Sequence, residues 1–336
     1  MTGMADVTIG LPIPGQMAAA YSYFGAASSL GYDRAEGLRF DFLYGGTPLE
    51  TAKALSSGAC KFAPLNMAVG FLANERGWPL RAVYSSSRRA HRWFAVPPNS
   101  TVTSLADFRG KKIACDFADL QPLAESALAE EGIDASDVTF VPWRGSGMEV
   151  RHMLASLRDG TVDGVFLIDW NHGDFIAEGM PMRRIPSRLM DEAELSSCLW
   201  TLPATLADPC VAGVCRAVAK ATLFAIENPA AVIEMMWADH PRTRPAEAER
   251  GRELRRGVEI LRARTDTMRP EGAQDPRWGA MLATEFAAAR DHLRRSGAIR
   301  HRHDPATLFD ASRVAEINTF DVAQVIAQAR SFPSYR

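Results

Sequence analysis

The sequence predicts an α/β fold of two βαβ lobes followed by extra C-terminal helices. Three observations lead to this prediction. Through the first 165 residues, short β-like runs alternate with amphipathic helical stretches, which is typical of βαβ units around a parallel sheet. The same order of strand, helix, glycine and short strand occurs in 38–85 and again in 111–168. Beyond Pro203 the pattern becomes almost wholly helical.

Length, composition and charge fit this fold class. The 336 residues correspond to roughly two domains, and 47% hydrophobic and 23% charged residues are ordinary for a soluble protein. The formal net charge of −2 provides no basic field for nucleic acid or an anionic membrane. We therefore expect no nucleic-acid partner. Because 33 of the 38 basic residues are arginine, a skew that indicates genomic composition bias, a single arginine is weak support for a binding site.

Membrane insertion and a secretory leader are not expected. The longest apolar runs, such as 162–168, contain Asp163 and are far shorter than the roughly 20 residues of a spanning helix. The N-terminus lacks the basic region, apolar core and cleavage site of a secretory signal. We therefore expect either a cytoplasmic protein or one whose leader has been removed. The cysteines show no CxxC spacing and are interpreted as buried free thiols: Cys60, Cys115, Cys198, Cys210 and Cys215.

The first unit contains strands and a capped helix. Its strands are short apolar or alternating runs, expected at 7–11, 38–44, from 62, at 80–85 and at 93–96. After the second strand, Thr47 is placed as a helix N-cap, Pro48 at the first helical position and Glu50 at the third, which makes a capping box. That helix is expected to end at Gly58.

The second unit repeats this order after a second cap at 104–107. Strands are expected at the apolar runs 111–115, 138–143 and 162–168. Helices are expected at 120–131, where Gly132 ends the helix, and at 148–158.

The C-terminal part is expected to form amphipathic helices at 212–227, 246–264 and 278–296. The segment 242–302 holds fifteen arginines against nine acidic residues. One interpretation is a nucleic-acid face. The favoured interpretation is a solvated helix surface with Glu–Arg pairs four residues apart.

Four segments, met in the expected order, together resemble one known family. They are GGTPLETAKALSSG at 45–58 followed by FAP at 62–64, SLADFRGKKI at 104–113, LRDGTVDGV at 157–165, and NTFD at 318–321. They resemble the substrate-binding proteins of ABC importers for sulfonates, taurine, nitrate and thiamine-pyrimidine precursors. The resemblance spans nearly the whole chain and is specific for the fold and the family rather than for the ligand.

The resemblance implies a type II periplasmic-binding-protein fold, in which two α/β lobes are joined by two crossing strands. Lobe one would comprise 1–92 and 200–336, and lobe two 97–195. It also implies a solute-binding protein that captures a small molecule in the cleft by hinge closure and delivers it to an ABC permease in the periplasm. We expect a monomer without a cofactor.

Candidate ligand contacts in lobe one lie where strands end. In open α/β sheets, ligands bind beyond the strand C-termini, where helix N-termini present free N–H groups. The residues at these positions are Gln16, Gly46, Thr47 and Asn66. Arg89 is added as a cation beside the first of the two strands that join the lobes. For Thr47, ligand contact and helix capping are equally favoured.

Candidate contacts in lobe two are Asp116, Asp119, Trp143, Arg144, Asp169 and Trp170. Asp116 and Asp119 occupy the position of the family's first ligand loop, which is usually rich in glycine and serine. Two carboxylates at this position would repel a simple oxyanion. Asp119 is equally well explained as an N-cap. The two indoles favour a planar ligand, although Trp143 also suits the edge of the lobe, and Arg144 offers a fork for a carboxylate. Trp170 and Asn66 are predicted to face each other across one cleft.

No catalytic or metal site is predicted. The segment 301–304 holds two histidines, but no partner ligands stand at a defined spacing. The alternative function is a cytoplasmic enzyme on the same fold, similar to a thiamine-pyrimidine synthase or an aromatic-acid decarboxylase. The cysteine cluster of the former is absent, and Asp116, Asp119, Asp169 and His172 are the acid–base candidates. A structural interaction protein is the third class considered.

Overall fold

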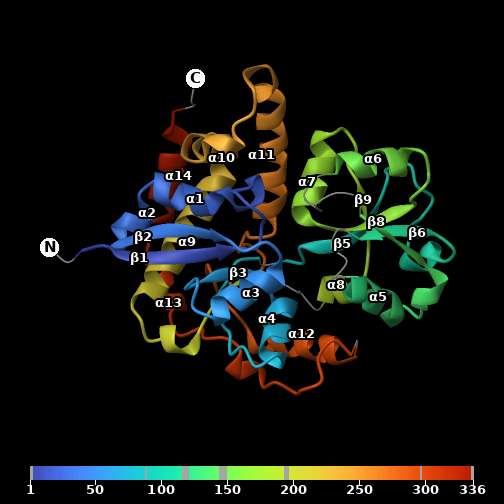
Figure 1. Ribbon diagram of the computed structural model, residues 1–336, viewed down its shortest axis with the longest axis horizontal. Coiled ribbons are helices and arrows are strands. Elements are labelled where there is room, and N and C mark those ends of the chain that lie inside the picture. The colour runs from blue at the N-terminus through green and yellow to red at the C-terminus, as the bar shows by residue number, and fades with distance from the viewer. Residues whose placement is uncertain are drawn as a thin grey trace.

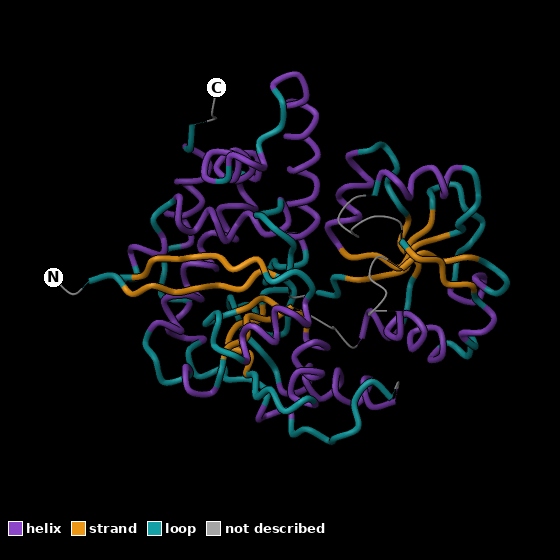
Figure 2. The backbone as a smooth tube through the Cα atoms, in the orientation of Figure 1, coloured by secondary structure: helices purple, strands orange, loops and turns teal. Residues whose placement is uncertain are grey.

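The structure is a computed structural model that describes residues 3–87, 89–115, 121–143, 150–192, 197–295 and 297–333. Its strands form three sheets of two, three and five members (Figure 2). The ribbon in Figure 1 divides into two lobes, with β5–β9 and α5–α8 together on one side. The predicted α/β class and two-lobed architecture are therefore confirmed.

The first sheet pairs β1 (Ala5–Leu11) with β2 (Leu38–Tyr44) in parallel, and both strands end together because Leu11 is opposite Tyr44. Ile9 lies in one core with Phe24 of α1 (Ser22–Ser29) and Val218 of α9 (Cys210–Glu227). The second sheet has the order β3 (Ala63–Asn66), β10 (Ser197–Thr201), β4 (Arg81–Ser85), with β10 antiparallel to both neighbours.

The five-stranded sheet has the order β7, β6, β8, β5, β9. Its strands, all drawn from residues 92–185, are β5 (Arg92–Val96), β6 (Lys112–Cys115), β7 (Thr139–Pro142), β8 (Gly164–Ile168) and β9 (Arg183–Ile185). Strands β6, β7 and β8 run parallel, as βαβ units require, whereas β5 is antiparallel to β8 and β9. The lobe limits expected from the sequence stay predictions.

Helices follow the strands at their C-terminal ends. In the first lobe these are α1, α3 (Pro48–Ser56) and α4 (Met67–Glu75), and in the second α5 (Gln121–Glu130), α6 (Arg151–Arg158), α7 (Asp169–Ala177) and α8 (Arg188–Glu192). The short α2 (Tyr32–Ala35) lies between α1 and β2. The capping box of α3 is confirmed: Glu50 N–H donates to Thr47 Oγ1 at 3.2 Å, and Thr47 N–H donates to Glu50 Oε2 at 2.8 Å.

The C-terminal part is helical, as predicted, and has three helices that were not expected, at 229–239, 314–317 and 322–331. Its further helices are α10 (Pro229–Asp239), α11 (Arg250–Asp266), α12 (Ala283–Arg295), α13 (Val314–Ile317) and α14 (Val322–Ser331). The sequence pattern did not indicate α10, because most of its side chains are apolar and buried, which removes the amphipathic period. Asn228 lies between α9 and α10. Its side chain caps α10 by accepting a hydrogen bond from Ala231 N–H at 3.2 Å.

Two further expectations are decided by burial and length. Four of the cysteines are buried free thiols as predicted, and Cys210 is half-buried. Among the described residues, no helix has both the length and the apolar character needed to cross a bilayer.

Candidate functional site

A cavity of about 420 Å³ lies between the two lobes, bounded by the loop after β1 and by α7, α10 and α11. Its apolar walls include Ile13, Met17, Trp170, Ile233, Met236 and Trp237. Polar groups are fewer: Gln16, Arg242, Thr243, Glu253 and Arg256. A concave space that combines apolar walls with a small number of polar side chains is the usual form of a small-molecule site.

The register of the first sheet positions the floor of this cavity. Because β1 and β2 are parallel and end together, the loops that follow them meet at one edge of the sheet. The Gly45 N–H donates to the Leu11 carbonyl at 2.9 Å, and the Gly46 N–H donates to the Ile13 carbonyl at 3.2 Å. Gly46 has φ +79°, which a glycine adopts without strain. These bonds turn the 13–20 segment over the sheet edge.

Close packing of α7 on α11 forms the wall between the lobes, and Figure 1 shows the two helices side by side. Gly173 makes the approach possible, since a methyl group at this position would collide with the backbone of Glu259. The sequence signal was a single glycine inside a helical segment, which is tolerated where backbones meet closely.

A buried ion pair crosses this interface. Arg264 Nη1 of α11 lies 2.9 Å from Asp169 Oδ2 at the start of α7, and both side chains are at most 3% exposed. Thr267 Oγ1 donates to the same carboxylate oxygen at 3.2 Å, and Trp170 N–H donates to Oδ1 at 2.7 Å. Burial raises the pKa of the Asp169 carboxyl, and the Arg264 guanidinium opposes that rise.

A second ion pair joins the same two helices, α7 and α11, one to two helical turns away from the first. Arg256 holds Asp174 with two bonds, Nε to Oδ1 at 2.6 Å and Nη2 to Oδ2 at 2.8 Å. Arg151 of α6 extends the network by pairing with Glu253 at 2.9 Å and with Glu178 at 2.9 Å. Because this geometry is bidentate and partly buried, the pair fixes the angle between α7 and α11 more than an exposed pair would.

The cavity brings together two of the residues predicted from the sequence, Gln16 and Trp170. Asp169 is next to it in sequence but fully buried, with its oxygens engaged by protein groups. Asn66 lines a separate, much smaller cavity with His91 and Arg92. Among the described residues, the structure therefore places Trp170 and Asn66 in different cavities.

Other predicted contacts have local roles in the structure. Asn66 Oδ1 accepts from Val69 N–H at 2.8 Å and so caps α4, as Thr47 caps α3. Arg89 donates to the Glu271 carbonyl at 3.2 Å. Trp143 is 8% exposed and packs edge-on against Phe175 at 6.1 Å in the core of the second lobe. Their contact with a ligand stays a prediction.

The remaining predicted contacts, Asp116, Asp119 and Arg144, lie outside the residues that the structure describes.

Arg256 and Arg264 were not among the residues predicted for the site. The interpretation of the arginine-rich segment as a solvated helix surface is wrong for Arg264, which is 2% exposed. A signal was present: Gly257, Leu261 and Arg264 follow one another at spacings of four and three, so Arg264 continues the buried face of α11. Elsewhere on α11 the surface pairs form at i,i+3, as between Arg262 and Glu259.

Among the described residues, one group of side chains has the types and spacing of metal ligands, and it lines neither of the two cavities. These are Glu75, His301 and His303.

Solved structures with the same fold cover nearly all of the chain. The alkanesulfonate-binding protein SsuA of Xanthomonas axonopodis, bound to MOPS, has a TM-score of 0.63 at 17% identity and covers 93% of this chain and 100% of its own. The aliphatic sulphonate-binding protein SsuA of Escherichia coli has a TM-score of 0.63 at 15% identity, with 90% and 91% covered. The desulfurization enzyme DSZB has a TM-score of 0.61 at 15% identity, with 93% and 98% covered. At these identities the likeness shows the fold alone.

Sequence comparison adds the family. No curated protein sequence matches the chain. The profile described as NMT1/THI5-like matches residues 20–232, which run from the 3₁₀ turn before α1 to the start of α10 and include Trp170. Because this span is more than half of the 336 residues and carries three of the four segments on which the resemblance was based, the chain belongs to the NMT1/THI5-like family.

Proposed function

We propose that this protein binds a small organic solute with a flat apolar body and a hydrogen-bond acceptor, and that it does so in the cavity beside Trp170. The observation that carries the proposal is the lining of this 420 Å³ space, in which two indoles and several aliphatic side chains surround a few polar groups. Aromatic walls favour a planar ligand because stacking adds to the burial of apolar area.

Trp170 gives the proposal its polar contact. Its ring is 5% exposed, and the guanidinium of Arg264 lies 4.7 Å from the ring centroid. Its Nε1–H is buried and has no hydrogen-bond partner among the described residues. An unpaired buried donor costs about 1–3 kcal/mol. A ligand acceptor that reaches this nitrogen as the lobes move would recover that cost, which favours a solute with a carboxylate, sulfonate or ring acceptor.

The charges around the cavity favour an anionic substituent near its mouth. Arg256 is neutralised by Asp174 and Glu253. Arg242 is exposed and forms no ion pair with any described residue. Gln16 provides both a donor and an acceptor. These groups suit a planar acid or amide better than a planar cation.

The family and the fold support a transport role for this binding. We propose that the solute is captured as the lobes close about a hinge, that the closed form is recognised by an ABC permease, and that this occurs in the periplasm. The sulfonate-binding proteins with the same fold support such a role.

The test is a ligand screen with two readouts. Purified protein is titrated with aromatic carboxylates, aromatic sulfonates, aminopyrimidines and amides, and binding is followed by calorimetry and thermal unfolding. A ligand at one hundred times its Kd is expected to stabilise the protein by about 2.7 kcal/mol. Mass spectrometry of each mixture should show the compound unchanged. The absence of any stabilising planar ligand would contradict the proposal.

An enzyme is the second candidate, because the desulfurization enzyme DSZB has the same fold. The described residues that line the cavity include no cysteine, serine or histidine, which supports binding over covalent chemistry. Conversion of a bound compound at catalytic rates in the same screen would establish the enzyme instead.

A further inference from the structure

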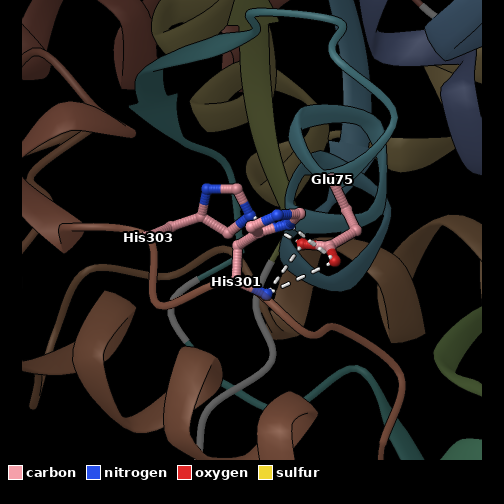
Figure 3. A group of neighbouring side chains, drawn as sticks. All are labelled: Glu75, His301 and His303. Atoms are coloured by element: carbon pink, nitrogen blue, oxygen red, sulfur yellow. Dashed lines mark hydrogen bonds and ion pairs between the residues drawn. The ribbon is translucent and has the colours of Figure 1, made fainter.

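Three side chains of the kind that bind transition metals meet on the outside of the first lobe (Figure 3). Glu75 is the last residue of α4, and His301 and His303 lie on the loop that follows α12. In Figure 3 the carboxylate and the two imidazoles point toward one another. One ligand atom from each residue lies within 4.8 Å of the other two.

The spacing of these atoms suits a metal ion. Glu75 Oε1 lies 2.9 Å from His301 Nδ1, and Oε2 lies 3.0 Å from His303 Nε2. Around a tetrahedral zinc ion with bonds of about 2.0–2.1 Å, neighbouring ligand atoms are about 3.3 Å apart. Small side-chain rotations therefore bring the three ligand atoms, which lie within 4.8 Å of one another, to the separations that an ion requires.

The carboxylate is held in place by the backbone of the same loop. Arg300 N–H donates to Glu75 Oε1 at 2.9 Å, and His301 N–H donates to Oε2 at 3.2 Å. The ring of Phe71, one turn earlier on α4, meets the ring of His303 edge-on at 6.3 Å. Such outer contacts orient metal ligands and reduce the cost of assembling the site.

The three side chains are not fully buried, so a metal ion has a path to them from solvent. The side chains of Glu75 and His303 are 16% and 18% exposed, whereas that of His301 is 74% exposed. An ion can therefore reach the site, and a fourth position remains for water. An ion pair between the carboxylate and protonated imidazoles is the competing explanation of this geometry.

We propose that Glu75, His301 and His303 bind a divalent transition-metal ion of the zinc class, for which two imidazoles and a carboxylate are suitable ligands. The three residues line neither cavity, so the ion does not meet the solute. The ion connects the loop after α12 to the end of α4. Glu75 is 226 residues from His301 in the chain and 228 residues from His303.

Zinc binding to the full chain tests the proposal. Protein stripped with a chelator and kept reduced is titrated with zinc by calorimetry, and one ion per chain is expected to bind. His301→Ala and Glu75→Gln are each expected to weaken binding at least about tenfold. His152→Ala removes an exposed histidine of the second lobe and is expected to leave binding unchanged. Cobalt bound in place of zinc should lack the charge-transfer absorption of a thiolate ligand.

A second measurement separates binding from folding. Zinc is expected to raise the unfolding temperature of the parent and of His152→Ala, but not that of His301→Ala. Because His301 is largely exposed, its replacement should leave the metal-free unfolding temperature unchanged. Zinc affinity equal to that of the parent in both His301→Ala and Glu75→Gln, or no zinc binding by the parent, would overturn the proposal and leave the ion pair as the explanation.

Discussion

At the scale of single residues, the proposed solute site is tested at Trp170, which lines the cavity. Replacement by alanine would open the core, so Trp170→Phe is the sharper change: it keeps the ring and removes the Nε1–H. If a ligand acceptor meets this donor, binding should weaken by about 1–3 kcal/mol. Calorimetry with a ligand from the screen measures the loss. Trp93→Phe serves as the control, because Trp93 lies in the core of the second lobe, its Nε1–H has no partner among the described residues, and it does not line the cavity. Equal losses in the two variants would exclude a specific role for Trp170.

The Asp169–Arg264 pair is expected to show the cost of a lone buried charge. Arg264→Met keeps the length of the side chain but leaves the carboxylate without its cation, and breaking a buried pair in this way costs about 3–5 kcal/mol. Urea unfolding of this variant, of Asp169→Leu and of the double variant measures the coupling. A double variant less stable than Arg264→Met alone would mean that the pair does not explain the loss.

A buried histidine, His292, and a half-buried one, His172, predict a pH dependence of stability. Burial lowers the pKa of His172 and, despite Glu130 nearby, that of His292. As the pH decreases, the histidines of the unfolded chain bind protons near their ordinary pKa of about 6.5, whereas those of the folded protein bind protons only at a lower pH. The free energy of unfolding should therefore be highest above that pH and should fall as the pH decreases through and below it.

The pH prediction is checked by urea unfolding across this range. His292→Gln is expected to flatten the decline, whereas His152→Gln, at an exposed position, should reproduce the parent curve. A decline as steep in His292→Gln as in the parent would assign the effect to other groups.

At the scale of elements, the contact between α7 and α11 depends on Gly173. Gly173→Ala places a methyl group against the Glu259 backbone, and overpacking of this kind costs about 1–3 kcal/mol. At Gly251, on the exposed start of the same α11, a methyl group would meet only the end of the Arg255 side chain at an ordinary contact distance of 3.8 Å. Gly251→Ala should therefore stabilise the helix by about 0.5–1 kcal/mol. Thermal unfolding of both variants checks the contrast, and equal effects would contradict the close approach.

At the scale of the whole molecule, ligand binding should draw the lobes together. The ion pairs Asp169–Arg264 and Asp174–Arg256 hold α7 to α11, so closure is expected to pivot on this side. Small-angle scattering should show a smaller radius of gyration when the ligand saturates the protein. An unchanged profile at saturation would mean that the lobes do not move.

Sequence patterns predicted those parts of the molecule that depend on neighbours in the chain. The capping box at Thr47, the turn at Gly58 and the strand runs at 38–44 and 162–168 follow from interactions over a few residues. The resemblance added the two-lobed fold, which composition and periodicity do not specify. The helix α10 was missed because burial on nearly all sides removes its periodicity.

Only the tertiary structure decided which distant residues meet. Arg264 comes together with Asp169 over 95 residues of chain, and Glu75 with His303 over 228. Trp170 and Asn66 both follow apolar strands, yet Trp170 lines a cavity with residues of α10 and α11, whereas Asn66 lines a smaller one with His91 and Arg92. The sequence by itself determined the fold class, the family and the elements whose periodicity survives burial. The location and polarity of the candidate sites required packing between segments, since local spacing carries no information about contacts made across the chain.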